Sequence, residues 1–174
     1  MSTHERQRGQ SIIELAIATP ILLTLVLGGF TAGTLISDRV VGGYACRQGA
    51  RLAAVLGGSQ TNPAPVATVD ANIVKSVLAA ARGLNYAQVS EIDIYSPTRA
   101  DGQYTPGDPA DRYNGSGTLI GAIGLPMANR VQSPPSETSI GVRLVWQFTP
   151  ATAFMTLNLQ MSEYAVLKVA PDLT

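Results

Sequence analysis

Few residue types in this chain could carry out enzymatic chemistry. His4 is the only histidine and Cys46 the only cysteine among the 174 residues. A hydrolytic triad needs a histidine beside a nucleophile, and a zinc site needs several histidines or cysteines that converge. One cysteine also cannot form an intrachain disulfide. We therefore expect no catalytic residues, no metal centre and no cofactor, and we expect Cys46 to be a small buried apolar residue.

Three aspartates could in principle offer oxygen ligands to calcium: Asp101, Asp108 and Asp111. Their spacing does not follow the EF-hand pattern, so we predict no metal site there. They lie in residues 96–118, a stretch with four glycines and three prolines that is typical of a loop.

Glu14 is the charged residue in the most unusual place. It stands directly before 23 residues without a charge, from Leu15 to Ser37. A carboxylate at the edge of a membrane segment is costly unless it is paired, which makes it a candidate functional residue. The alternative is that Glu14 only marks the membrane boundary, where a charge is tolerated. Position alone does not decide between the two.

The uncharged segment is long enough to cross a membrane. At about 1.5 Å per residue, such a helix spans roughly 34 Å, against about 30 Å for a hydrocarbon core. A buried core helix is disfavoured because the segment is apolar on all sides. A cleaved secretory signal is the stronger alternative, although its apolar region is usually shorter. Pro20 should bend the helix.

The flanking charges predict the orientation. Arg6 and Arg8 precede the apolar segment in a very short tail, which should stay in the cytoplasm. Three arginines also follow the segment, but a long domain is translocated largely regardless of its charge. The chain as a whole carries twelve basic and twelve acidic residues, so nothing in its charge favours a nucleic-acid partner. We expect the amino terminus inside and the carboxy-terminal domain outside.

The sequence RGQSIIELAIATP resembles the leader of type IV prepilins. The resemblance implies that a prepilin peptidase cleaves between Gly9 and Gln10 and removes residues 1–9. Glu14 is then the fifth residue of the mature chain. Its carboxylate could neutralise the new α-amino group of Gln10 in an adjacent subunit. The chain departs from many type IV pilins in having glutamine rather than an aromatic residue at the first mature position.

The segment after the apolar run resembles the TadE-like family, the minor pilins or pseudopilins of the tight-adherence (Tad, or Flp) pilus. The resemblance rests on the leader, the glutamate that opens an apolar helix, and a motif formed by Gly49, Ala50 and Arg51. It implies a role in the assembly, initiation or capping of an adhesive filament. It also implies partners: a prepilin peptidase, other pilin subunits, the inner-membrane platform of the pilus and membrane lipid.

Two further features of the first helix concern packing. Gly29 and Gly33 form a G-x-x-x-G pair that could let another helix approach closely, although such pairs are common by chance. Residues 38–56 should extend the membrane helix (10–37) and pack one apolar side on the outer domain. The residues predicted for that side are Val40, Val41, Tyr44, Ala45, Gln48, Leu52, Val55 and Leu56.

Residues 57–174 should form an extracytoplasmic head of the α+β class, with a small antiparallel sheet packed on helices. The glycines at 57 and 58 predict a break, and a stripe of apolar residues predicts a helix over 66–82. Alternation predicts strands over 89–95, 140–148 and about 163–169. Arg143 and Glu163 could face each other across the last two.

Two other classes of function stay open at this point. The chain could be a membrane-tethered binding module whose Gly-Glu leader matches by chance. It could also be a secreted hydrolase, although no nucleophile motif supports this. Determination of the mature amino terminus would separate the first of these from a pilin.

Overall fold

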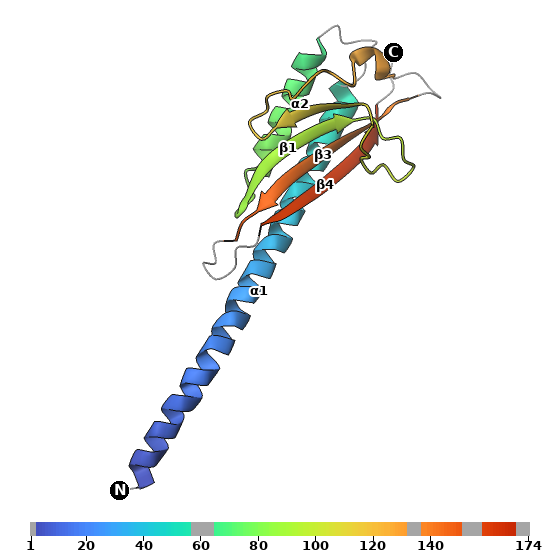
Figure 1. Ribbon diagram of the computed structural model, residues 1–174. Helices are drawn as coiled ribbons and strands as arrows, with labels where there is room; N and C mark the ends of the chain where they lie inside the picture. Colours follow the sequence, from blue (N-terminus) through green and yellow to red (C-terminus); the bar gives the residue numbers. More distant parts are fainter. Residues whose placement is uncertain (1–2, 57–64, 132–136, 151–157, 170–174) are drawn as a thin grey trace.

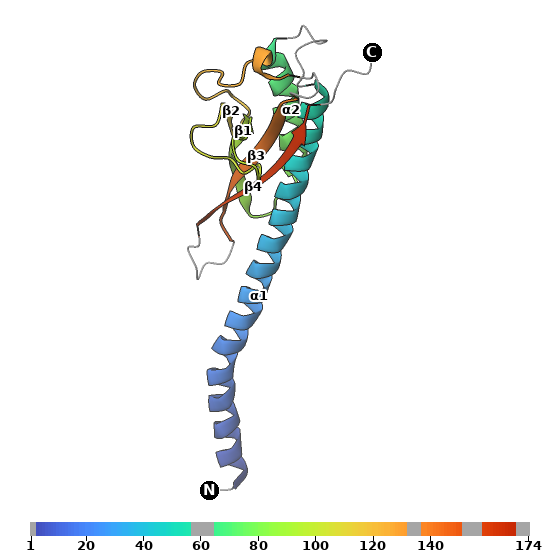
Figure 2. The same ribbon diagram turned by 90° about the vertical axis from the view of Figure 1, so that its right-hand side faces the viewer.

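The computed structural model describes residues 3–56, 65–131, 137–150 and 158–169, with side chains from Gln10 onward. One long helix, α1 (Thr3–Leu56, 54 residues), projects from a small head (Figure 1). Pro20 is the only proline inside it. Figure 2 shows the helix axis bending in its blue, amino-terminal part, where this proline removes a backbone donor. The predicted break at 57 and 58 lies outside the described residues.

The head contains a four-stranded antiparallel sheet and a second helix, α2 (Val66–Ala81). Its strands are β1 (Ala87–Tyr95), β2 (Ala110–Asn114), β3 (Ser139–Phe148) and β4 (Leu159–Lys168), in the order β2-β1-β3-β4. A short 3-10 helix, η1 (Met127–Asn129), precedes β3. The α+β class predicted from the sequence is confirmed.

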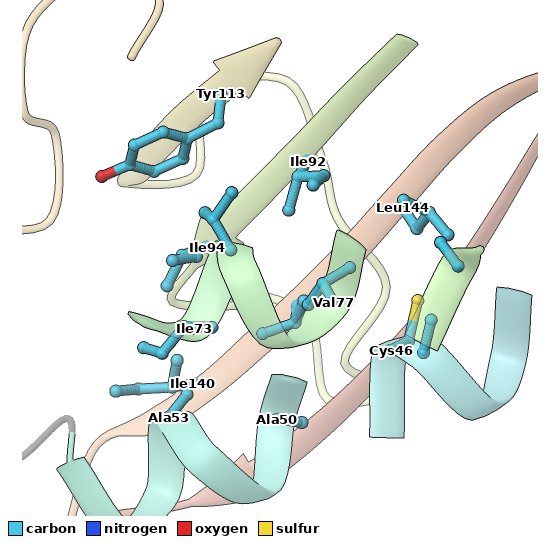
Figure 3. Close-up of a cluster of buried hydrophobic side chains, with 14 of the residues drawn as sticks. Cys46, Ala50, Ala53, Ile73, Val77, Ile92, Ile94, Tyr113, Ile140 and Leu144 are labelled. Atoms are coloured by element: carbon cyan, nitrogen blue, oxygen red, sulfur yellow. The ribbon is translucent and has the colours of Figure 1, made fainter. Parts of the chain in front are cut away.

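The carboxy-terminal part of α1 and the whole of α2 cover the same face of the sheet (Figures 1 and 2). Alternate residues of β1 and β3 point toward these helices and are buried: Ile92, Ile94, Ile140, Val142, Leu144, Trp146 and Phe148. Figure 3 shows several of them converging with Ile73 and Val77 of α2 and with Cys46, Ala50 and Ala53 of α1. The end of the long helix is therefore part of the head's core.

Strand β2 was not predicted, because it lies inside the expected loop of residues 96–118. Its sequence alternates in burial, with Asp111 and Tyr113 inward and Arg112 outward. A buried aspartate does not fit the alternating pattern from which a strand is predicted, because apolar residues normally occupy the inward face. Strand β4 also begins earlier than expected, at Leu159.

The predicted inner side of α1 is confirmed only in part, because Ala45 is buried and Leu52 and Leu56 pack against the core. Val40, Tyr44 and Val55 point outward and are 64%, 52% and 68% exposed. The face that packs on the head consists almost entirely of small residues: Gly42, Ala45, Cys46, Gly49, Ala50, Ala53 and Ala54. Small side chains allow the helix axis to lie close to the sheet and to α2. Some of the larger residues that the pattern placed on this face therefore point away from the head.

Candidate assembly site

The amino-terminal part of α1 carries the residues predicted for processing and assembly. The backbone from Arg6 through Arg8 and Gly9 is helical and continues without a break into Gln10. Glu14 lies one turn further on, where its carboxylate oxygen Oε1 accepts a hydrogen bond from Gln10 Nε2 at 3.2 Å. Both side chains are exposed. The structure thus puts the two residues on one side of the helix, open to another molecule.

Beyond Glu14 the helix exposes its apolar side chains. The large ones from Ile12 to Val26 are 54–71% exposed, and no other described element covers them, whereas Leu27 is half-buried. Among the described residues, α1 is the one helix long and apolar enough to cross a membrane. Gly29 and Gly33 lie on this bare stretch, with no atom within 4 Å of an added Cβ at either position. The G-x-x-x-G pair is therefore open to a neighbour and makes no contact within the described part of the chain.

The threonine hydroxyls of this stretch are satisfied within the helix itself. Thr19 Oγ1 donates to the carbonyl of Leu15 at 2.6 Å, and Thr24 Oγ1 donates to that of Pro20 at 2.8 Å. Thr31 makes the same contact with the carbonyl of Leu27 at 2.9 Å. A hydroxyl paired in this way can face hydrocarbon without an unmet donor.

Asp38 fastens the helix to the head where the apolar stretch ends. The residue is fully buried, and its Oδ1 accepts a hydrogen bond from the backbone N–H of Asn85 at 2.9 Å. Its Oδ2 accepts from the N–H of Tyr86 at 3.4 Å, and Phe30 packs edge-on against the Tyr86 ring at 6.3 Å between centroids. Sequence reasoning missed this role. The available signal was an aspartate at the first position after an uncharged run.

A second fastening lies next to Asp38, on the side of β4. Arg39 Nε donates to Glu163 Oε1 at 3.2 Å. The predicted pairing of Glu163 with Arg143 is wrong, because Glu163 stands opposite Leu144 in the sheet and Arg143 opposite Tyr164. Neighbouring residues of a strand point to opposite faces, so a shift of one residue separates the two. Arg143 instead binds Asp93 Oδ2 at 3.1 Å.

Cys46 is fully buried within the core, as predicted. Its Sγ donates a weak hydrogen bond to the carbonyl of Glu163 at 3.1 Å. Burial raises the pKa of the thiol to about 12. The side chain therefore stays a neutral thiol, consistent with packing rather than chemistry.

The motif formed by Gly49, Ala50 and Arg51 divides between two faces of α1. Gly49 and Ala50 are buried against the head, and Arg51 is exposed on the opposite side. A Cβ on Gly49 would collide with Val77 of α2 and lie 3.0 Å from Val142 Cγ1 of β3. Glycine is required here because two elements approach the helix backbone at once.

A buried charge network that was not predicted from the sequence holds the loop after β2. Arg130 is fully buried and donates from Nη1 and Nη2 to both oxygens of Asp70, at 2.7 and 2.9 Å. Its Nη2 also reaches Asp111 Oδ2 at 2.9 Å. The other oxygen of Asp111 accepts from the N–H groups of Gly124 and Leu125 at 2.6 and 3.0 Å. The contact between Asp70 and Arg130, which are 60 positions apart in the chain, thus helps to hold this loop in place.

Two carboxylates share one guanidinium in this network, and the surroundings are apolar. Burial is the largest influence on Asp70 and raises its pKa to about 6, although Arg130 acts in the opposite direction. The role of the network is to hold α2, β2 and the loop together.

The aspartates considered for calcium have different partners. Asp101 pairs with Arg99 at 2.6 Å, whereas Asp108 accepts from the Thr98 hydroxyl at 2.6 Å and the Thr105 N–H at 2.8 Å. Asp111 belongs to the buried network. In the described part of the chain these three carboxylates serve separate local structures.

Comparison with known families matches residues 9–51 to the model described as TadE-like protein. The match confirms the resemblance found in the sequence, and it lies wholly within α1. It begins at the predicted cleavage residue and ends at Arg51. No curated protein and no solved structure matches the chain.

Proposed function

We propose that this chain, TadE-like over residues 9–51, is a minor pilin that takes part in the assembly, initiation or capping of a Tad pilus used for adhesion. The observation that carries the proposal is the place of the match. It falls on a single helix whose first half is bare and apolar and whose second half enters the core of the head. This design suits a subunit that moves from a membrane into a filament through the same helix.

The proposed division of the chain follows from this design. Residues 1–9 are a cytoplasmic leader that a prepilin peptidase removes, and residues 10–37 cross the membrane. Residues 38–56 continue the helix into the head, which comprises residues 57–174 and lies outside. The protein is thus a single-pass protein of the cytoplasmic membrane that can pass into the filament. Its partners are the peptidase, other pilin subunits, the platform of the pilus and lipid.

The proposed role is structural, and no residue is assigned to catalysis. Glu14 is exposed at the point where the apolar surface begins, and in the unprocessed chain its partner is the side chain of Gln10. Cleavage after Gly9 would create an α-amino cation at Gln10. We propose that Glu14 then pairs with this cation on an adjacent subunit, where little water is available to solvate either charge.

Processing gives the direct test. We expect intact-mass measurement of membrane-extracted protein to show loss of residues 1–9 in cells with an active prepilin peptidase. Gly9→Val should block this cleavage, because the peptidase must take the backbone in an extended form with no side chain in the way. The helical backbone at Gly9 would have to unwind first.

Gly28→Val is the matched control, because it makes the same change on the same helix at a position with no neighbour within 4 Å. It should be processed like the wild type. If the wild-type protein retains Met1 in such cells, the pilin proposal loses its main support, and a membrane-tethered binding module becomes the better hypothesis.

A further inference from the structure

From the outer end of the proposed span onward, α1 has an outward face unlike the surface of an ordinary soluble helix. Ile36, Val40 and Tyr44 follow one another at intervals of four residues and are 63%, 64% and 52% exposed. Residues four apart lie on one side of a helix, so the three form a continuous apolar strip. Apart from Asp38, the residues of this part of α1 that are buried against the head are small. The large apolar side chains are thus placed away from the core.

Two arginines continue this strip toward the end of the helix. Arg47 and Arg51 are exposed, four residues apart, and neither has an ion-pair partner among the described residues. The arginines at 39, 112 and 143 all have carboxylate partners. Arg47 lies along the helix surface, since a Cβ on Gly43 would be 3.5 Å from its Nη1. We call the five residues 36, 40, 44, 47 and 51 the outward strip.

We infer that the outward strip binds an α-helix from a different pilus subunit, one that presents carboxylates to Arg47 and Arg51. The inference rests on the proposed function and names the partner of the assembly surface. The apolar residues supply area to bury, and the unpaired guanidinium groups supply complementarity to acidic side chains. Carboxylates one helical turn apart would match the spacing of the two arginines.

Lipid does not account for the arginines. Arg47 and Arg51 lie 10 and 14 residues beyond Ser37, or roughly 15 and 21 Å along the helix. The headgroup region adds only about 5–7 Å beyond the hydrocarbon on each side. With the span at residues 10–37, Ile36 lies at its outer end, and the part of the strip from Tyr44 to Arg51 extends past the membrane surface.

A second copy of this chain, parallel and in register, fits the strip poorly. Such a pair would bring arginine beside arginine, and like charges at close range are destabilising. The carboxylates on the described side chains of α1 are Glu14 and Asp38, and Asp38 is fully buried. Glu14 lies 33 residues before Arg47, or roughly 50 Å along the helix. The charge pattern thus favours a subunit of another kind.

Site-specific photocrosslinking in cells that assemble the pilus tests this inference. Tyr44 is replaced by a benzophenone-bearing amino acid in the full-length chain, with Lys75 on the exposed side of α2 as the control position. We expect a crosslink from position 44, but not from position 75, to a different pilin-type subunit. Mass spectrometry should place it in a helical peptide that contains Asp or Glu.

Charge variants in the same experiment test the role of the arginines. Arg47→Glu combined with Arg51→Glu should lower the yield of the crosslink at least tenfold, whereas the double lysine variant should keep most of it. Arg82→Glu reverses an exposed arginine outside the strip and should have no effect. A crosslink to lipid or to a second copy, no crosslink at all, or a yield unchanged by the glutamates would overturn the inference.

The two proposals can fail separately. Intact mass of the same samples reports whether residues 1–9 are removed. Retention of the leader in the wild type contradicts the proposed function itself. Removal of the leader, together with a crosslink that the arginines do not influence, contradicts only the inference about the outward strip.

Discussion

Glu14 and Asp38 are two carboxylates on one helix in opposite surroundings. Asp38 is fully buried and accepts backbone hydrogen bonds from its own chain, so its role is to hold the head in place. Glu14 is exposed and has the side chain of Gln10 as its hydrogen-bond partner. Because this partner is a neutral amide, the negative charge of Glu14 near lipid is not balanced by it. The carboxylate can therefore pair with a cation from another molecule.

We expect Glu14→Gln to be inserted in the membrane and cleaved after Gly9, but to assemble poorly. Loss of the carboxylate would leave the α-amino cation of a neighbouring Gln10 without its partner. Breaking one side of a poorly solvated ion pair costs about 3–5 kcal/mol where burial is deep and less near headgroups. A loss of about 1.4 kcal/mol already lowers association tenfold. Co-purification with other pilin subunits and counts of pili measure the effect.

Normal piliation and normal recovery of partner subunits with Glu14→Gln would confine this residue to marking the membrane boundary. In that case the change should be neutral or slightly favourable for insertion, because it removes a charge beside lipid.

The buried network predicts how the stability of the head changes with pH. The folded-state pKa of Asp70 is about 6, above its ordinary value of 3.8, so the folded protein binds more protons between these values. Stability from this group is therefore complete below pH 3.8 and is lost as the pH rises through 6. Between pH 7.5 and pH 5 this group alone should contribute a gain of about 1.4 kcal/mol.

Thermal melting in detergent, followed by the fluorescence of the buried Trp146, measures this gain. Asp70→Asn should remove the part of the gain that belongs to Asp70. Asp93, whose pKa burial raises to about 7, acts in the same direction and leaves a larger dependence in the variant, so the measurement is the difference between the gains of the two proteins. An equal gain in the wild type and in Asp70→Asn would show that Asp70 is held ionised by Arg130.

At the scale of elements, α1 uses its glycines in two ways. Gly49 faces both Val77 and Val142, whose branched side chains have little freedom to move. We expect Gly49→Ala to lower the free energy of unfolding of the head by about 1–3 kcal/mol through overpacking. Gly33→Ala is the matched control, since its added Cβ meets nothing within 4 Å.

The control should leave melting unchanged or raise it slightly, because alanine favours the helix by about 0.5–1 kcal/mol over glycine. Equal melting temperatures for the two alanine variants would mean that α1 does not pack on the head as closely as described. Reduced assembly of Gly33→Ala with unchanged melting would indicate that another helix approaches at the G-x-x-x-G pair.

Elements with strong local patterns could be predicted from the sequence. The uncharged segment predicted the exposed part of α1. The alternation from Ile140 to Phe148 predicted β3 with a start one residue late. Strand β2 could not be found in this way. Its buried Asp111 is acceptable only because Arg130 lies beside it in space, 19 residues away in the chain.

The face of α1 that enters the core was predicted only in part, for a related reason. Periodicity locates the apolar residues of a helix, but it does not say whether they cover the chain's own core or remain for another molecule. Here the close approach of α2 and the sheet selects glycine and alanine for the inner face. Asp38 also depended on distant partners, since Asn85 lies 47 residues further on.

The head should lie on the outer side of the membrane. The leader charges Arg6 and Arg8 should keep the amino terminus in the cytoplasm. A reporter enzyme active only outside the membrane, fused after Thr174, should be active. The same reporter fused before Met1 should be inactive. Activity of a cytoplasm-specific reporter at Thr174 would overturn this orientation.

Because α1 continues into the head as one uninterrupted helix, no flexible linker lets the two parts rotate relative to each other (Figure 1). A pull on the amino-terminal half travels along roughly 80 Å of hydrogen-bonded helix. The force reaches the sheet only as shear across the face of α1 that carries the small buried residues. The strands therefore lie beside the line of tension. Extraction from a bilayer would lift helix and head as one stiff body, with the work done against lipid and not in unravelling the sheet.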